Sequence, residues 1–461
     1  MKKLRQVPRI KQRISFKQIA VASSLGLATL AIAFTVFNGG MLQSDTARAS
    51  ASMAKAAKEN IKQGDDFYMA DVPEYLQAIP HYEEAIKAEP ENAELNLKLG
   101  VCYLNSHNKF KALGYFSKAA TLMPGIDPMI HFYLARSFQI NSEFDKAIDE
   151  YNRHLSIKQD LLKDEARKFI DECKTAKELV ANPVDVKIEN LGAAVNSMYP
   201  DYAPYISANE DLLFYTSRKA ETQGGGRDEF DGVFFEDIYM SRTQGVVWQQ
   251  ATNAGQPVNT PTHDAVAGLS SDSKTLFVFK GDLNEGDILI SSFENGKWST
   301  PESVGKNINS KYHESTASLS PDKRTLYFVS DRPGSFGGRD IFKSTWDDVK
   351  KEWGKAQNLG ETINTQYDEE GVFMHPDGSK LYFSSQGHNT MGGYDIYCSK
   401  LKDGAWQTPA NLGYPVNTPD DDVFYSVAQN GHAYYSSIRK EGFGDKDIYR
   451  ITYIQNDVAR K

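Results

Sequence analysis

The chain has 461 residues, of which 25% are charged and 11% are aromatic, and this length and composition indicate a globular protein of two or three domains. The formal net charge is −9, but the first 49 residues carry eight Lys or Arg against one acid, so the remainder carries −16. The negative charge of residues 50–461 argues against nucleic acid as a partner, because nucleic acid favours basic surfaces. The same charge favours basic or neutral partners.

An uncharged, mostly apolar run of nineteen residues, 19–37, follows seven Lys and Arg. It is long enough to span a bilayer and somewhat long for the core of a signal peptide. Ala47-Arg48-Ala49 offers a small-x-small cleavage site, so residues 1–49 are either a cleaved signal peptide or an uncleaved inner-membrane anchor. In both cases we expect everything after Phe37 to be exported to the periplasm or cell envelope, with a membrane contact through 19–37 if the segment is uncleaved.

Residues 50–182 carry a helical repeat. The stretch "LGVCYLNSHNKFKALGYFSKAATLMPG" from Leu99 has the small and aromatic residues of a tetratricopeptide repeat at the expected spacing: Leu99, Gly100, Tyr103, Ala112, Phe116, Ala119 and Pro124. A copy lies 34 residues upstream, with Ala78, Tyr82, Ala85 and Pro90, and a third includes Ala135, Phe138, Ala147 and Tyr151. The apolar stripe from Leu162 to Leu179 predicts a further helix that covers the open end of the stack. Such stacks offer a concave surface for a partner's peptide.

Residues 183–455 carry five copies of a repeat of about fifty residues, with four short β-rich runs per copy, and residues 456–461 form a tail. The copies align on Trp248, Trp298, Trp353 and Trp406, on Asn196, Asn259, Asn309, Asn364 and Asn417, and on five Asp-Ile pairs. Four strands per repeat predict a five-bladed β-propeller. The expected fold class is therefore α + β multidomain: an all-α repeat stack followed by an all-β propeller.

The last copy has no Trp run after its Asp-Ile strand, whereas an extra strand-like run, "VDVKIENLG" from Val184, precedes the first copy. We expect this first strand to complete the last blade, because closure of the ring removes two exposed strand edges.

The pattern "LSPDKRTLYFVSDRPGSFGGRDIF" from Leu319 resembles the WD40-like propeller repeat of the Tol-associated periplasmic protein. Together with the helical repeats and the export signal, residues 64–453 resemble Bacteroidota envelope proteins, some of which serve type IX secretion and gliding. That resemblance implies an envelope protein with protein partners, among them outer-membrane or secretion components. Members of this group often end in an OmpA-like peptidoglycan-binding domain, and this sequence does not contain one, so the resemblance does not extend to a direct cell-wall anchor.

The repeated Asp-Ile phrase has a structural interpretation. Each blade needs a turn before its third strand, and an Asp there can accept hydrogen bonds from backbone N–H groups of the turn. These residues are Asp237, Asp287, Asp340, Asp395 and Asp447. A calcium role remains the alternative, because the loop "EFDGVFFED" from Glu229 is rich in carboxylates, although no EF-hand pattern is present.

No motif for a nucleophile, a zinc site, a phosphate loop or a disulfide framework occurs, so no cofactor and no metal site is predicted. His263 and His313 occupy equivalent positions and are interpreted as loop-packing residues. Cys102, Cys173 and Cys398 are interpreted as small apolar side chains.

An acid follows each repeat Asn by five residues, at a position expected to open the innermost strand near the central channel. Two interpretations stay open: an acidic ring at the channel mouth that binds a cation or a basic tail, or five carboxylates that each cap a loop within one blade. The residues are Asp201, Asp264, Glu314, Glu369 and Asp422.

Two functions are compatible with these features. The first is a non-enzymatic scaffold of the bacterial envelope, in which each repeat domain holds a protein partner, as part of a secretion or motility assembly. The alternative is a carbohydrate-active or hydrolytic propeller that uses carboxylates at the channel mouth. Glycoside hydrolysis needs two carboxylates in unlike environments, whereas the five acids here are copies of one another, which favours the scaffold.

Overall fold

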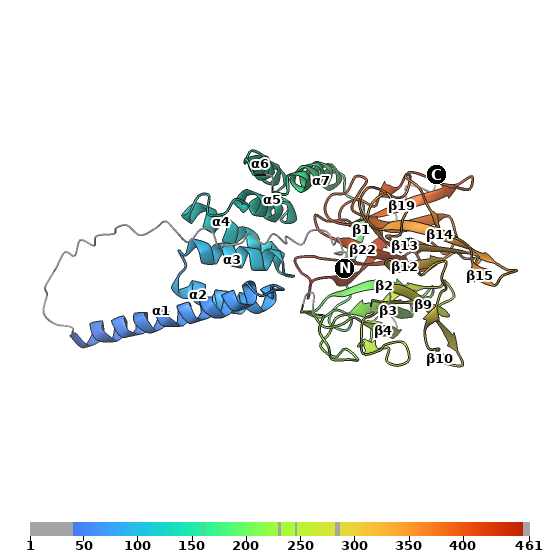
Figure 1. Cartoon of the computed structure of the whole chain (residues 1–461), viewed down its shortest axis with the longest axis horizontal. Helices are drawn as coiled ribbons and strands as arrows, with labels where there is room; N and C mark the ends of the chain where they lie inside the picture. The colour runs from blue at the N-terminus through green and yellow to red at the C-terminus, as the bar shows by residue number, and fades with distance from the viewer. Residues whose placement is uncertain (1–39, 160, 229–231, 245–246, 282–285, 455–461) are drawn as a thin grey trace.

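A computed structural model describes residues 40–454, except 160, 229–231, 245–246 and 282–285. A helical region comes first and a five-bladed β-propeller follows, which confirms the predicted fold class (Figure 1). The apolar run 19–37 lies outside the described residues. Within the described part of the chain, no helix combines the length and the apolar character needed to cross a bilayer.

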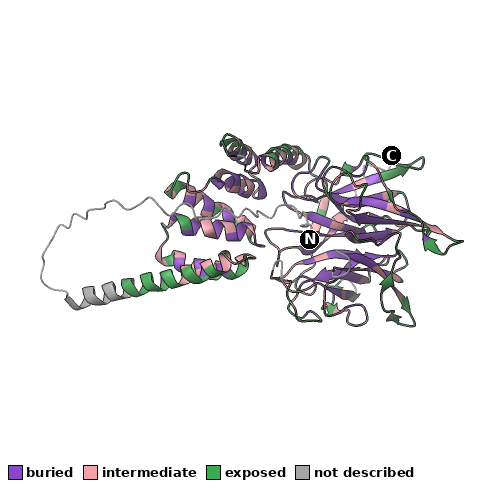
Figure 2. Cartoon of the chain, in the orientation of Figure 1, coloured by how far each residue is buried: buried purple, intermediate pink, exposed green. Residues whose placement is uncertain are grey.

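Seven α-helices build the helical region. They are α1 (Gly40–Tyr68), α2 (Tyr75–Ala88), α3 (Ala93–Leu104), α4 (Ala112–Leu122), α5 (Ile130–Ile140), α6 (Phe144–Leu155) and α7 (Lys163–Ala181), with a short 3-10 helix, η2 (Lys109–Lys111). Helices α1 and α2, α3 and α4, and α5 and α6 pack as consecutive pairs, and α7 packs on α6. The first part of α1 extends away from the other helices, and residues 51–56 are exposed (Figure 2).

Small residues let the paired helices approach closely. A Cβ added at Gly64 would lie 2.5 Å from the ring of Tyr82, and one at Gly100 would lie 2.6 Å from the ring of Phe116. Both rings are fully buried. The aromatic and small residues singled out in the sequence are therefore the ones at which the helices of a pair meet.

The propeller consists of five antiparallel sheets. The first blade contains β2 (Asp201–Ile206), β3 (Leu212–Ser217), β4 (Asp237–Gln244), β5 (Val247–Trp248) and β6 (Thr252–Asn253). The second contains β7 (Asp264–Leu269), β8 (Thr275–Lys280), β9 (Asp287–Glu294), β10 (Lys297–Trp298) and β11 (Glu302–Ser303). The third contains β12 (Glu314–Leu319), β13 (Thr325–Ser330), β14 (Asp340–Asp347), β15 (Glu352–Trp353) and β16 (Gln357–Asn358).

The fourth blade contains β17 (Glu369–Met374), β18 (Lys380–Ser385), β19 (Asp395–Lys402), β20 (Ala405–Trp406) and β21 (Ala410–Asn411). The fifth contains β22 (Asp422–Val427), β23 (Ala433–Ser437) and β24 (Asp447–Tyr453), and β1 (Val186–Asn190) completes it. The two-residue strands β6, β11, β16 and β21 pair back onto the third strand of their blades, which the sequence analysis did not anticipate.

The ring closes through β1, as predicted. β1 pairs with β24 in antiparallel register, with Ile188 opposite Ile451 and Asn190 opposite Tyr449. The first strands of the blades, β2, β7, β12, β17 and β22, are neighbours in cyclic order around the ring. Since β22 contacts β2, the first and last blades pack directly.

The Trp strands pack blade against blade. Trp298 lies edge-on to Phe214 of the preceding blade, with ring centroids 5.6 Å apart. Trp248 contacts Tyr434, and Trp406 contacts Tyr327, each at 6.0 Å. These three Trp residues therefore each cover an aromatic residue on the second strand of the blade before, whereas Trp353 packs edge-on against Trp346 of its own blade.

We predict that deletion of 184–190 lowers the melting temperature of the chain much more than truncation after Asn456. The deletion exposes the edge of β24 and the apolar face of the fifth blade, whereas the tail 456–461 lies outside the described residues. Thermal melts of both variants followed by circular dichroism provide the measurement. Equal melting temperatures would contradict closure by β1.

Candidate functional site

The five acids predicted at the channel mouth are the first residues of β2, β7, β12, β17 and β22. All five have no exposed surface. The backbone N–H of each acid donates to a carbonyl of the preceding blade, as Asp264 N does to Glu236 O at 2.9 Å and Asp422 N to Tyr394 O at 2.7 Å. The acids therefore lie at corresponding places around the ring, at the boundary between blades.

Each carboxylate is hydrogen-bonded to a Ser or Thr four residues earlier in its own blade. Asp264 accepts from the backbone N–H of Thr260 at 2.6 Å and from its hydroxyl at 2.8 Å. The same pair of bonds joins Asp201 to Ser197, Glu314 to Ser310, Glu369 to Thr365 and Asp422 to Thr418. These bonds are the ones expected if each acid caps a loop within its own blade. The alternative, an acidic ring at the channel mouth that binds a cation or a basic tail, stays a prediction.

Four of the five acids have a cation nearby. Lys280 Nζ lies 2.6 Å from Asp264 Oδ1, and Arg332 Nη2 lies 2.9 Å from Glu314 Oε1. Lys219 Nζ is 3.9 Å from Asp201 Oδ1, and the charge of Arg439 opposes the effect of burial on Asp422. The fourth blade has Gly387 where the first, third and fifth have Lys or Arg.

Burial raises the pKa of Glu369 to about 8, and no Lys or Arg among the described residues pairs with it. Burial also raises the pKa of Asp201 to about 6 and that of Asp422 to about 7, although Lys219 and Arg439 oppose the effect there.

In the fourth blade His388 takes over a hydrogen bond of the missing cation, because its Nε2 lies 3.0 Å from Ile363 O. Burial lowers the pKa of His388 and so favours its neutral form, whereas the first, third and fifth blades have a Lys or Arg at the position of Gly387.

The Asp residues of the Asp-Ile pairs hold the turns before the third strands. Asp395 Oδ2 accepts from Met391 N at 2.8 Å and from Asn411 Nδ2 at 2.7 Å. Equivalent bonds reach Asp237, Asp340 and Asp447. The fifth, Asp287, is adjacent to residues 282–285, which lie outside the described residues. The contacts are of the kind expected from the sequence.

The repeat Asn residues make a contact that the sequence analysis missed. Asn259 accepts from the backbone N–H of Ile238 and donates to its carbonyl, each at 2.9 Å. The other four form the same two bonds: Asn196 with Ile448, Asn309 with Ile288, Asn364 with Ile341 and Asn417 with Ile396. Each Asn thus fixes the linker between two blades to the third strand of the blade that the chain has just left. The sequence contained a signal for this contact, because an Asn and an Asp-Ile pair recur together in all five copies of the repeat.

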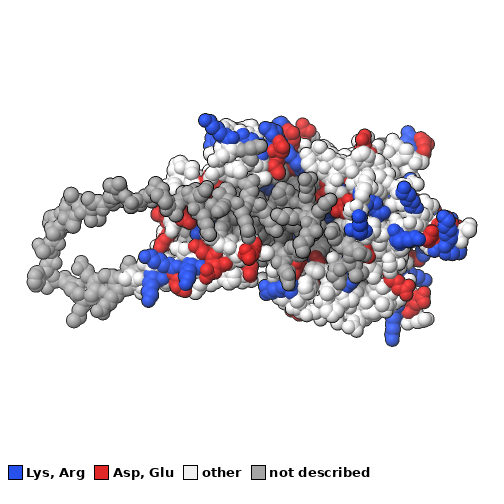
Figure 3. Space-filling model, in the orientation of Figure 1, with Lys and Arg blue, Asp and Glu red and all other residues white. Residues whose placement is uncertain are grey.

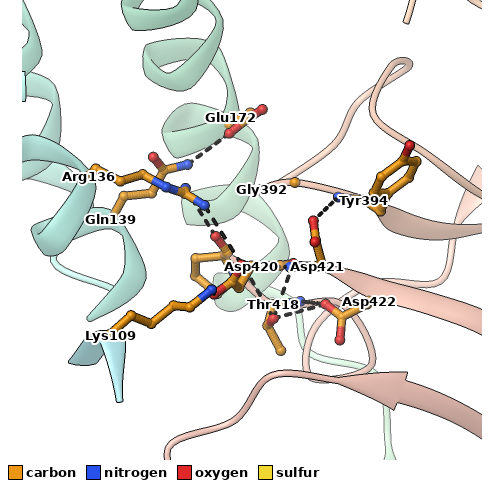
Figure 4. A network of polar contacts seen from close by, with 12 residues as sticks. Lys109, Arg136, Gln139, Glu172, Gly392, Tyr394, Thr418, Asp420, Asp421 and Asp422 are labelled. Atoms are coloured by element: carbon orange, nitrogen blue, oxygen red, sulfur yellow. Dashed lines mark hydrogen bonds and ion pairs between the residues drawn. The ribbon is translucent and has the colours of Figure 1, made fainter. Parts of the chain in front are cut away.

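The helical region is docked on the face of the propeller where these loops lie (Figure 4). Lys109 Nζ is 2.8 Å from Asp420 Oδ2, and Arg136 Nη1 donates to Pro419 O at 3.3 Å. Burial alone raises the pKa of Asp420, but the charges of Lys109 and Arg136 hold it below its usual value. Met391 is fully buried in a core that it shares with α5, α6 and α7.

Asp420 is specific to the fifth blade, because the equivalent residues are Tyr199, Thr262, Tyr312 and Tyr367. An alignment of the five copies therefore contained a signal for this contact, because the fifth copy has an acid at a position where the other four copies have Tyr or Thr. The sequence analysis did not single it out.

The two His residues pack against aromatic rings. His263 lies 4.5 Å from Phe235 and also pairs with Glu236, and His313 lies 5.4 Å from Phe279. Among the described residues, no group of His, Cys, Asp and Glu could hold a metal ion. The first residues of the carboxylate-rich loop considered for calcium, 229–231, lie outside the described part of the chain. Cys102 and Cys173 are buried, Cys398 is partly buried, and all three are free thiols.

No protein-family model and no curated protein matches the chain. Solved structures resemble it over the propeller. TolB from Acinetobacter baumannii matches with 15% identity and a TM-score of 0.33, over 52% of this chain and 53% of TolB. This chain thus matches only about half the length of that protein.

A putative TolB from Agrobacterium tumefaciens matches with 16% identity and a TM-score of 0.35, over 59% of this chain and 84% of the other. A GH43 beta-xylosidase/alpha-arabinofuranosidase from a compost microbial metagenome matches with 11% identity and a TM-score of 0.38, over 59% and 94%. At these scores the likeness assigns neither a family nor a function.

We predict that Asn259→Ala lowers the free energy of unfolding by about 2 kcal/mol, because it leaves the buried N–H of Ile238 without a partner, whereas the C=O of Ile238 keeps its bond from Ala254 N. Urea unfolding followed by Trp fluorescence measures the change. Asn209→Ala is the control, since Asn209 is exposed. Equal stabilities of the two variants would show that the Asn contact contributes little.

We predict that the free energy of unfolding falls between pH 5 and pH 8.5, and that Glu369→Gln reduces this fall by a few kcal/mol. A carboxyl that keeps its proton in the folded chain up to about pH 8 stabilises the fold fully below its ordinary pKa of 4.5. This contribution is lost as the pH rises toward 8.

The measurement is urea unfolding at a series of pH values. Glu314→Gln is the matched control, because it leaves Arg332 without its carboxylate and should destabilise the chain at every pH in this range. Parallel pH profiles of the wild type and Glu369→Gln would contradict the prediction.

Proposed function

We propose that the chain is a non-enzymatic scaffold of the bacterial cell envelope, in which the helical region is a tetratricopeptide repeat stack and the WD40-like propeller carries a second interaction surface. In this proposal the chain is exported to the periplasm, with residues 1–49 acting as a signal peptide or an inner-membrane anchor. Its partners are proteins of the envelope, among them components of a secretion or motility assembly of the type IX kind.

The observation that carries the proposal is how the helical region meets the propeller. The contacts between the described residues of the two regions include the turns near Glu74 and Lys109, α5, α7 and the apolar core that α6 shares with Met391. Among the described residues, no hydrogen bond or ion pair joins α4 to the propeller. The stack is thus held firmly at one edge, and its broad faces remain available for a partner.

The buried charges support binding over catalysis. A glycosidase needs two carboxylates that reach the substrate and differ in environment. The five repeated acids have no exposed surface and are bonded to their own loops. The negative charge of the chain after residue 49 favours basic or neutral partners and disfavours nucleic acid.

The function is tested in cells by photo-crosslinking from α4 and, separately, from the propeller. We expect each position to capture a defined envelope protein, and we expect the chain in the periplasmic or membrane fraction. Mass measurement of the mature N-terminus distinguishes cleavage near Ala49 from an uncleaved anchor. Turnover of a chromogenic glycoside that is lost in Asp422→Asn, or an unprocessed chain in the cytosol, would overturn the proposal.

We predict that Asp420→Ala separates the helical region from the propeller without unfolding either. The change removes the carboxylate that Lys109 and Arg136 contact, and so leaves these two partly buried cations without their counter-charge. Small-angle X-ray scattering should show a larger radius of gyration, while circular dichroism stays unchanged. Asp272→Ala is the control, because Asp272 pairs with Lys323 within the propeller. An unchanged radius for Asp420→Ala would show that the apolar contacts suffice for docking.

A further inference from the structure

The blades repeat a pair of loops on the face that carries the helical region. In each pair, a Gly of the loop before a third strand lies against the loop that opens the next blade. A Cβ added at Gly392 would lie 2.4 Å from Pro419 O, and one at Gly444 would lie 2.6 Å from Ser197 O. Since Gly337 and Gly224 make the same close approach to the following blade, the loop pairs are equivalent surfaces around the ring.

One of these surfaces is already a docking position. At the boundary of the fourth and fifth blades the residue before the Gly is Met391, which is fully buried in a core shared with Ala135 of α5 and with Cys173 and Ala176 of α7. Figure 4 shows Gly392 beside α7 at the level of Glu172. The loop pair therefore holds a helix through one large apolar side chain packed among small ones.

The equivalent position between the fifth and first blades is uncovered. The residue before Gly444 is Phe443, with 47% of its surface exposed, and the facing loop carries Met198, with 64% exposed. Of the boundaries described, this one alone pairs two large exposed apolar side chains: Phe336 faces Gln366 between the third and fourth blades, and Gln223 faces Pro261 between the first and second.

This surface is continuous with the interface between the two regions. Burial lowers the pKa of His107 in the turn before α4, and the nearby Asp445 opposes this change, so the Phe443 loop lies next to the helical region. Tyr199 occupies the position that Asp420 has at the filled boundary, so an occupant here needs no cation. Figure 3 shows that charged side chains of both signs are scattered over the described surface of the molecule in this view.

We infer that the Met198/Phe443 surface is a docking site for an α-helix of a partner protein, a helix that presents small apolar side chains as α7 does to Met391. The inference rests on the proposed scaffold function and adds a place and a chemistry for one partner.

The probe is a synthetic, fluorescein-labelled peptide with the sequence of α7, Lys163–Ala181, titrated into the full chain and followed by fluorescence anisotropy. We expect saturable binding that Phe443→Ser and Met198→Ser each weaken about tenfold. Phe336→Ser is the matched control, because Phe336 has the same loop position and the same 47% exposure but faces a polar Gln366, and it should leave binding unchanged.

Displacement of the chain's own α7 is distinguished with Met391→Ser. Binding that is lost in Met391→Ser and kept in Phe443→Ser would place the peptide at the filled boundary and overturn the inference. No binding at about 1 mM peptide, or equal effects of Phe443→Ser and Phe336→Ser, would overturn it as well. These outcomes leave the scaffold function standing, because crosslinking in cells tests that function at other positions.

Discussion

The contact between a repeat Asn and the backbone of an Ile organises the propeller. A blade boundary must join two sheets through a linker whose backbone groups are buried, and an unsatisfied buried group is costly. The Asn side chain presents one acceptor and one donor group to one Ile, as with Asn259 and Ile238. With Asn196 and Ile448 the same contact spans the first and last blades, so the ring closes by the interaction that builds each boundary.

The buried acids follow from this arrangement. Each linker continues from its Asn into a Ser or Thr and then into the first strand, so the acid at the start of that strand can reach back and cap the linker. A buried carboxylate needs compensation, by a cation such as Arg332 or by protonation, as for Glu369. In the fourth blade His388 supplies a hydrogen bond to the linker, and burial raises the pKa of Glu369.

Departures from the repeat mark where the molecule is not symmetric. Asp420 and Met391 occupy positions of the repeat that hold other residues in the other described blades. At the boundary of the fourth and fifth blades, Asp420 contacts Lys109, and Met391 packs into the core of α5–α7. A repeat protein gains a unique docking position in this way, by changing one or two side chains on an unchanged backbone. The exposed Met198 beside the Phe443 loop is a second departure of the same type.

The sequence by itself determined the helix pairs, the five blades and closure through β1, because periodic spacing of small, aromatic and strand-forming residues reports local packing that repeats. It also located the repeated acids, although it left their role open. Only the tertiary structure decided that Asn196 bonds to Ile448, that Asp420 meets Lys109, and that Glu369 lacks the cation its equivalents have. These contacts join residues far apart in the chain or depend on burial, and local periodicity carries information on neither.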